Sequence, residues 1–258
     1  MKDVAGMQVE RVAIAGSGLQ GTRVQQARVP GALFIHGWTG SRQDMAGPMM
    51  AAAAAGFACL DYDLHGHRAT ADQRAQVTLR GSLADAVDAC DSLAAMQNVD
   101  GDAIAVVGSS FGGWPAALLT TQRPVRWLAL RVPALYPDQW WDRSKESLDD
   151  AGLAAYRHSR RDRDTDQALA ACAAFEGEVL LVWSGHDELL PEGVSGSFQV
   201  AFPRAQALTV RKIRNADHGL SGGRSRSEYR SLLGAWLGSA LAARRRRGLL
   251  PVLEPDAE

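Results

Sequence analysis

The chain has few cysteines, no excess of charge of one sign and no long hydrophobic run. Its 258 residues include three cysteines, Cys59, Cys90 and Cys172, with no CxxC pair among them. An odd, widely spaced set predicts reduced thiols rather than a disulfide framework or a zinc site. Lysine and arginine number 28 against 29 acidic residues, a net charge of −1. Composition therefore gives no electrostatic case for binding nucleic acid or an anionic membrane.

The sequence also lacks a membrane-spanning or secretory segment. A membrane helix needs about 18 consecutive apolar residues, and polar residues interrupt every run before that length. The first fifteen residues are broken by Asp3, Gly6 and Glu10, among others, which leaves no apolar stretch typical of a signal peptide. We therefore expect a cytoplasmic protein with no membrane span. A chain of this size buries enough surface to fold without a metal or disulfide.

Short apolar segments alternate with longer helical patterns from residue 32 onward. The first five apolar segments are nearly continuous, as expected for strands buried on both faces of a parallel sheet. Alternation of strands and helices predicts a doubly wound α/β fold, which we assign to a single domain over residues 1–258. The predicted strands are 32–36, 57–62, 103–108, 125–132, 178–184 and 207–213, and the predicted helices are 44–55, 82–97, 114–121 and 227–247.

Two regions depart from this alternation. Residues 9–15 and 22–29 are β-like and are separated by a glycine-rich stretch, which predicts an antiparallel hairpin at the edge of the sheet. Residues 135–175 are too long for a loop between strands and too polar for the core. Connections of this length are uncommon unless they serve as lids or binding loops. We expect 135–175 to be an inserted cap of short helices.

A candidate nucleophile lies where a predicted strand meets a predicted helix. Gly108 to Gly112 form a G-x-S-x-G pattern centred on Ser110, and the glycines allow the tight turn that exposes the serine hydroxyl. The same turn places the N–H of Phe111 at the helix N-terminus, where it can stabilise an oxyanion. A second G-x-S-x-G, centred on Ser221, follows no buried strand, so we interpret it as a loop.

A serine needs a base, and the base needs an acid that orients it. Asp187 and His218 each follow a predicted strand, at the strand ends where ligands bind in open α/β sheets. Glu188 and Asp217 compete with Asp187 for the acid role, and His186 competes with His218. We favour Asp187 because Asp217 is adjacent to the histidine in sequence and would point elsewhere.

A second oxyanion donor is needed from another loop. The strand 32–36 leads into the segment 37–40, and we expect the N–H of Trp38 to act with that of Phe111. His36 is expected to be structural, with its ring anchoring this loop.

Together these motifs resemble the α/β-hydrolase superfamily. Residues 61–67 are similar to its D-x-R-G-H-G turn, but His65 replaces the usual arginine, and Arg68 stands where glycine or serine is commoner. The resemblance covers residues 32–247. It implies a mostly parallel eight-stranded sheet flanked by helices, with a small cap after strand six that corresponds to 135–175. The motifs that carry it are HGW (36–38), GSSFGG (108–113), GHDELLP (185–191) and ADHG (216–219).

Two other motifs have simpler interpretations. Residues 16–21 match the dinucleotide pattern G-x-G-x-x-G, but a β-like stretch and Pro30 follow instead of a helix, so no nucleotide site is predicted. His65 and His67 are two residues apart without further ligands, which favours a hydrogen-bonded turn over a metal site. No metal or other cofactor is expected.

These observations predict a serine hydrolase that cleaves a carboxylic ester of a small molecule through an acyl-enzyme. Ser110 would attack the ester, His218 would act as base and then acid, and Asp187 would hold the imidazolium. Aromatic residues are candidates for an apolar substrate pocket under the cap. They are Trp114, Tyr136, Trp140 and Trp141, and Trp38 and Tyr62 are further candidates.

Two alternatives remain open from the sequence. A peptidase or amidase could use the same triad, with Glu146, Asp149 and Asp150 of the cap as candidates to bind an N-terminal amine. A non-catalytic ligand-binding relative would share the fold without the reaction. A homo-oligomer is possible, and the acyl preference is not determined.

Overall fold

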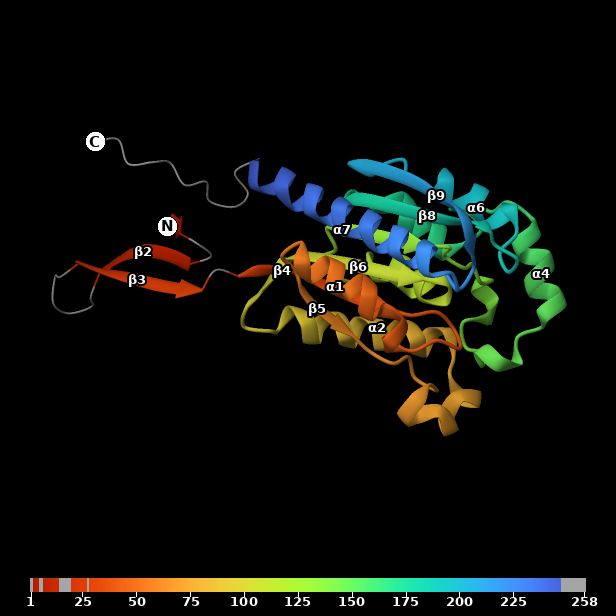
Figure 1. The fold of residues 1–258 in the computed structure, drawn as a ribbon. Coiled ribbons are helices and arrows are strands. Elements are labelled where there is room, and N and C mark those ends of the chain that lie inside the picture. Colours follow the sequence, from red (N-terminus) through yellow and green to blue (C-terminus); the bar gives the residue numbers. More distant parts are fainter. Residues whose placement is uncertain (1, 5–6, 14–19, 27, 247–258) are drawn as a thin grey trace.

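The computed structural model describes residues 2–4, 7–13, 20–26 and 28–246. Its centre is a parallel six-stranded sheet in the order β5-β4-β6-β7-β8-β9 (Figure 1). All six predicted strands and the α/β fold are confirmed. The strands are β4 (Val29–Ile35), β5 (Ala58–Asp61), β6 (Val99–Ser109), β7 (Trp127–Arg131), β8 (Glu178–His186) and β9 (Ala207–Asp217).

Each central strand faces two hydrophobic cores. In β4, Leu33 and Ile35 belong to one core, whereas Ala32 and Phe34 belong to the other. Successive side chains of a strand point to opposite faces, so a strand that is buried on both faces must be apolar throughout. This explains the nearly continuous apolar segments of the sequence.

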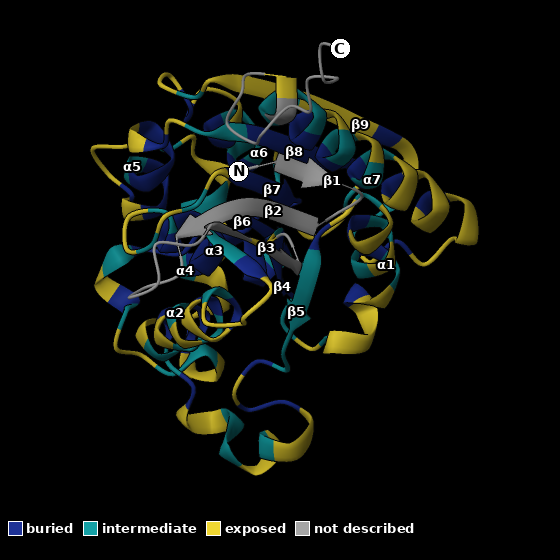
Figure 2. Cartoon of the chain, turned by 90° about the vertical axis from the view of Figure 1, so that its left-hand side faces the viewer, coloured by how far each residue is buried: buried dark blue, intermediate teal, exposed yellow. Residues whose placement is uncertain are grey.

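Helices cover both faces of the sheet. One face packs against α1 (Ala46–Ala54) and α7 (Gly223–Arg246), which contact each other. The buried central strands lie inside these helical layers, and the exposed residues lie on the outer helix surfaces and on the outer strand β9 (Figure 2). The helices of the other face are α2 (Leu79–Ala94), α3 (Gly113–Leu119), α4 (Asp150–His158), α5 (Gln167–Ala174) and α6 (Glu192–Gln199).

The N-terminal strands form a separate antiparallel sheet. It consists of β1 (Lys2–Val4), β2 (Met7–Ala13) and β3 (Gln20–Gln26), so the predicted hairpin is present. It does not extend the edge of the main sheet, which has six strands instead of the expected eight. Only two residues separate β3 from β4. So short a link could place β3 only beside β4, and both sides of β4 are already paired, with β5 and β6. Residues 16–19, which make up most of the dinucleotide-like motif 16–21, lie outside the described residues.

The segment 135–175 contains short helices, as predicted, between β7 and β8. Besides α4 and α5 it holds the 3₁₀ helices η4 (Asp138–Trp140) and η5 (Lys145–Ser147). Asp166 caps α5 by accepting a hydrogen bond from the Leu169 N–H at 3.0 Å, and it also accepts one from the Tyr156 hydroxyl at 2.7 Å. These bonds connect α4 to the start of α5 within the segment. Its role as a cap, within a single domain, stays a prediction.

Two further findings concern the described residues as a whole. None of their helices combines the length and apolarity that a membrane crossing requires. All three cysteines are free thiols, and Cys90 and Cys172 are buried.

Candidate active site

Ser110 lies at a strained turn between β6 and α3. Its φ of 53° falls in the left-handed region, which non-glycine residues rarely adopt and which marks many functional sites. A Cβ on Gly108 would lie 2.5 Å from the Gly112 carbonyl oxygen, and one on Gly112 would lie 2.3 Å from that of Ile35. Both positions therefore need glycine. The strand–turn–helix context predicted for Ser110 is present.

Ser110, His218 and Asp187 form a continuous hydrogen-bonded series. The Ser110 Oγ lies 2.8 Å from the His218 Nε2. The His218 Nδ1 lies 3.0 Å and 2.9 Å from the two carboxylate oxygens of Asp187. The side chains of His218 and Asp187 are only 15% and 10% exposed. An Nδ1–H that donates to the carboxylate leaves Nε2 free to accept the serine proton.

Asp187 is held in its ionised form. Burial alone would raise the pKa of its carboxyl, but the hydrogen bond with His218 and bonds from two backbone N–H groups outweigh burial and lower the pKa. These N–H groups belong to Leu189 and Leu190, at 2.9 Å and 3.0 Å from Oδ1. A carboxylate in this state can stabilise a positively charged imidazole.

The competing residues lie outside this series. Asp217 accepts hydrogen bonds from the N–H of Ser221 at 2.8 Å and from its hydroxyl, so the second G-x-S-x-G is a loop tied to Asp217. Glu188 and His186 are exposed. Of the alternatives left open by the sequence, only Asp187 contacts His218.

The end of the β8–β9 ladder sets the spacing of acid and base. The register shifts between Ser184 and His186, after which His186 pairs with Asp217. A Cβ on Gly185 would lie 2.0 Å from the Arg214 carbonyl oxygen, so the strands approach closely at this bulge. Asp187 and His218 are the next residues along each strand. Backbone pairing therefore brings them side by side.

The loop after β4 packs against the nucleophile. A Cβ on Gly37 would lie 3.3 Å from the Ser110 Cβ, and the Trp38 ring packs edge-on against Phe111 with centroids 5.2 Å apart. The two residues predicted to donate to an oxyanion thus contact each other beside Ser110. Thr39 has a φ of 69°, which is unusual for a β-branched residue.

Two buried histidines hold this loop. The His36 Nε2 accepts from the Leu64 N–H at 3.0 Å, and its Nδ1 bonds to the Gly37 carbonyl at 2.7 Å. The His67 Nε2 accepts from the Thr39 N–H at 3.2 Å. Both rings therefore need a neutral form with Nε2 unprotonated. Burial lowers the pKa of each. The structural role expected for His36, and the hydrogen-bonded turn expected for His67, are present.

Stability is expected to fall when the pH is lowered below about 6.5, the unfolded-state pKa of histidine. His36 and His67 keep lower pKa values in the folded protein, so in this window the unfolded chain binds more protons and the free energy of unfolding decreases. Urea midpoints between pH 7.5 and 5.5 measure this for the unmodified chain and for a His36→Gln/His67→Gln variant.

The diagnostic quantity is the difference in the pH dependence of the urea midpoint between the unmodified chain and the double variant. Burial raises the pKa of Asp166 to about 6, which has the opposite effect on stability in both proteins and cancels in the comparison. Midpoints that depend on pH to the same extent in both would contradict the assignment to the two histidines.

Arg131 was missed by the sequence reasoning. It ends β7, is only 7% exposed, and donates from Nε and Nη2 to the Ser109 hydroxyl at 3.0 Å and 2.7 Å. Its Nη1 donates to the His218 carbonyl at 2.7 Å. Burial lowers the pKa of this guanidinium. An arginine at the end of an otherwise apolar strand was the available signal.

A cavity of about 940 Å³ opens beside Ser110 and His218. Four residues predicted to line an aromatic pocket, Trp114, Tyr136, Trp140 and Trp141, are not part of its wall. Trp114 is completely buried and packs edge-on against the rings of Tyr136 and Trp141. These aromatic side chains belong to the core. The cavity wall includes Trp38, Met45, Arg131, Leu189, Arg226 and Tyr229.

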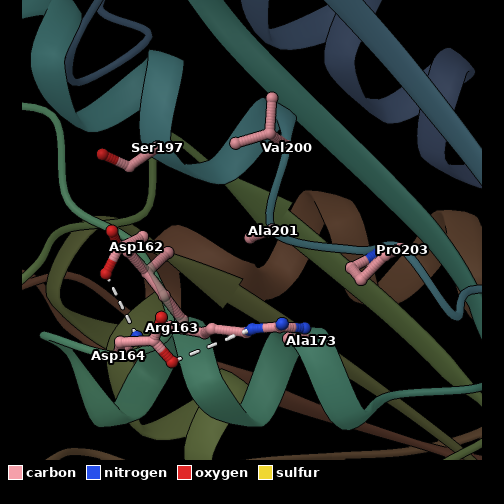
Figure 3. A pocket seen from close by; sticks show the side chains of 9 residues that line it. Asp162, Arg163, Asp164, Ala173, Ser197, Val200, Ala201 and Pro203 are labelled. Atoms are coloured by element: carbon pink, nitrogen blue, oxygen red, sulfur yellow. Dashed lines mark hydrogen bonds and ion pairs between the residues drawn. The ribbon is translucent and has the colours of Figure 1, made fainter.

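A second, smaller cavity lies between α5 and α6 (Figure 3). Its volume is about 280 Å³, and it shares no lining residue with the first. The hydroxyl of Ser197 in its wall is already bonded to the Gly193 carbonyl at 2.6 Å and to the Arg161 N–H at 2.8 Å. This serine is therefore structural.

Comparison with known proteins places the fold. The esterase domain of a Rhodothermus marinus protein is 18% identical, with a TM-score of 0.58 over 90% of this chain and 98% of that one. Est1E from Butyrivibrio proteoclasticus, solved with ferulic acid, is 16% identical, with a TM-score of 0.62 over 92% and 96%. The Paleococcus ferrophilus monoacylglycerol lipase is 15% identical, with a TM-score of 0.62 over 83% and 97%.

Sequence comparison identifies the family. No curated protein sequence matches the chain significantly. The sequence profile of the prolyl oligopeptidase family, however, matches residues 43–244. That range includes Ser110, Asp187 and His218 and makes up most of the chain. The chain therefore belongs to the prolyl oligopeptidase family and is a serine hydrolase of the α/β-hydrolase superfamily.

Proposed function

We propose that this hydrolase cleaves a carboxylic ester of a small molecule through an acyl-enzyme formed on Ser110. The observation that carries the proposal is the hydrogen-bonded series from Ser110 through His218 to Asp187. A serine placed against a base that a buried carboxylate orients is the arrangement needed for nucleophilic catalysis. The strained turn at Ser110 supports the same role.

The proposed reaction has two halves. The Ser110 oxygen bonds to the acyl carbon while the His218 Nε2 takes the serine proton and Asp187 stabilises the imidazolium. The carbonyl oxygen becomes an oxyanion, which the N–H groups of Trp38 and Phe111 bind. When the tetrahedral intermediate collapses, the alcohol leaves with the proton from His218. Water, deprotonated by His218, then attacks the acyl-enzyme, releases the carboxylic acid and restores the serine.

Charges near the site favour an ester over a peptide with a free N-terminus. Of the carboxylates considered for binding an amine, Glu146 pairs with the Arg74 Nε at 2.7 Å, and Asp149 caps α4 by accepting two backbone hydrogen bonds. Lys145 instead places its Nζ 5.0 Å from the centre of the Trp38 ring. A protonated amine would be repelled by this lysine.

A peptidase is the second candidate, because the family profile that matches the chain is that of the prolyl oligopeptidases. The same triad can cleave an amide when the site holds the peptide in register. A non-catalytic binding protein is the third candidate, and a complete triad argues against it.

The test combines active-site labelling with a comparison of three kinds of substrate on separate, unlabelled protein. A fluorophosphonate should add once to the folded protein, as measured by intact mass, whichever substrate is natural. We expect kcat/KM for the methyl ester of an acyl group to exceed that for its 4-nitroanilide, and aminoacyl-prolyl anilides to be poor substrates. Anilides cleaved as well as the ester would establish a peptidase. A folded protein without any adduct would establish a non-catalytic role.

A further inference from the structure

We propose that the cavity beside Ser110 selects an ester that carries an anionic group, such as a carboxylate, bound by Arg131, Arg226 and Arg230. The inference rests on the proposed function and deepens it by naming a substrate class. All three arginines line the cavity. They come from the end of β7 and the first turns of α7.

Arg131 is a buried cation without a carboxylate partner among the described residues. Its guanidinium has five N–H groups, and its described hydrogen bonds go only to the Ser109 hydroxyl and the His218 carbonyl. Burying a charge is costly unless a group of opposite charge compensates for it. An anion in the cavity would supply that compensation.

The nearest acidic groups are already engaged. Asp187 bonds to His218, and Asp217 bonds to Ser221. Asp44, also in the cavity wall, accepts from the Ser41 N–H at 2.8 Å. None of the three forms an ion pair with a cavity arginine within the part of the chain that the structure describes. They moderate the positive charge of the cavity without removing it.

Arg226 and Arg230 add a second cationic wall. They lie four residues apart on α7, so they share one helix face. The Arg226 Nη1 donates to the carbonyls of Leu220, at 3.0 Å, and of Ser221, which holds the side chain in the cavity wall. Arg230 passes over Gly47, where an added Cβ would lie 2.6 Å from its Cδ. Gly47 thus leaves room for the arginine to approach.

The three arginines line the same cavity as the nucleophile. Against them the wall carries a single carboxylate, that of Asp44. A cleft lined mainly by one sign of charge concentrates ligands of the opposite sign. Guanidinium groups bind carboxylates through paired, charge-assisted hydrogen bonds. An ester with an acidic group within reach of the scissile bond fits this surface.

The experiment compares esters that differ only in one negative charge. Mono-4-nitrophenyl glutarate and its methyl-capped diester place the charge on the acyl side. 4-Acetoxybenzoate and its methyl ester place it on the leaving group. We expect kcat/KM to favour the anion at least about tenfold in one of the pairs, the scale of one charge-assisted bond. Added salt should reduce that preference.

Matched variants assign the preference to the cavity. Arg226→Gln/Arg230→Gln should lower the anion-to-neutral ratio several-fold, because it removes two of the three cavity arginines and leaves Arg131. Arg224→Gln removes the same kind of charge from the same helix, outside the cavity wall, and should leave the ratio unchanged. Equal or better cleavage of the neutral ester in both pairs would overturn the inference, and so would a preference that is undiminished in the double variant.

A binding measurement separates this inference from the proposed function. If no ester is cleaved, the proposed function fails, and calorimetry with monomethyl glutarate and dimethyl glutarate decides on the anion site. Binding of the monoanion alone, weakened in the double variant, would support the site. Absence of binding would overturn it.

Discussion

Replacement of Ser110 by alanine is expected to lower kcat/KM for ester hydrolysis by on the order of 10⁴-fold or more. The variant keeps the turn between β6 and α3 but loses the oxygen that lies 2.8 Å from the His218 Nε2. The remaining groups can still bind substrate and an oxyanion, so a small residual rate is expected. Initial rates, together with intact mass after fluorophosphonate treatment, measure the effect.

Ser221→Ala is the matched control for this experiment. Ser221 is the centre of the second G-x-S-x-G and bonds to Asp217 instead of His218. Its variant should keep the single adduct and nearly the full rate. Labelling that persists in Ser110→Ala, or disappears in Ser221→Ala, would place the nucleophile elsewhere.

Asp187→Asn is expected to lower kcat by about 10³- to 10⁴-fold while the protein stays folded. An asparagine presents an amide N–H where the carboxylate accepted from the His218 Nδ1. The neutral side chain also cannot stabilise the imidazolium that forms when Ser110 loses its proton. The rate of fluorophosphonate labelling should fall with kcat, because both depend on an activated serine.

Asp217→Asn provides the comparison. Asp217 is next to His218 in sequence but holds the Ser221 loop. We expect a modest loss of rate from a looser loop. A loss as large as that in Asp187→Asn would assign the orienting acid to Asp217.

The sequence predicted the parallel sheet well, because burial on both faces leaves a direct pattern. Each residue of β4 from Ala32 to Ile35 enters one of two cores, so the strand is apolar without interruption. The position of the N-terminal hairpin left no such pattern. Which edge a hairpin joins depends on the length of its connection to the sheet, and here two residues link β3 to β4.

The candidate triad was predictable for a related reason. Ser110, Asp187 and His218 directly follow strands whose carboxyl ends meet at one edge of the sheet, so strand order alone brings them close. The cavity wall was not predictable in this way. An apolar ring such as Trp114 can pack in the core or line a pocket, and its residue type does not distinguish them.

The arginines of the cavity show the same limit. Arg226 and Arg230 lie on a long, largely polar helix, and most charged residues on such a helix face solvent. Their place in the cavity wall depends on how α7 packs against α1, a contact between distant parts of the chain. Arg131 gave a local signal, but its bonds to Ser109 and His218 span 22 and 87 residues.

The position of β9 has a consequence for how the protein loses function. Within the described part of the main sheet, β9 is an outer strand that pairs only with β8, whereas β6 lies between β4 and β7. Outer strands open locally at a lower cost than central ones. His218 follows the outer strand and Ser110 follows the central one. Mild denaturation would therefore separate Ser110 from His218 while most of the core is still folded. Activity should be lost before global unfolding, with only a local loss of structure, and should return when the denaturant is removed.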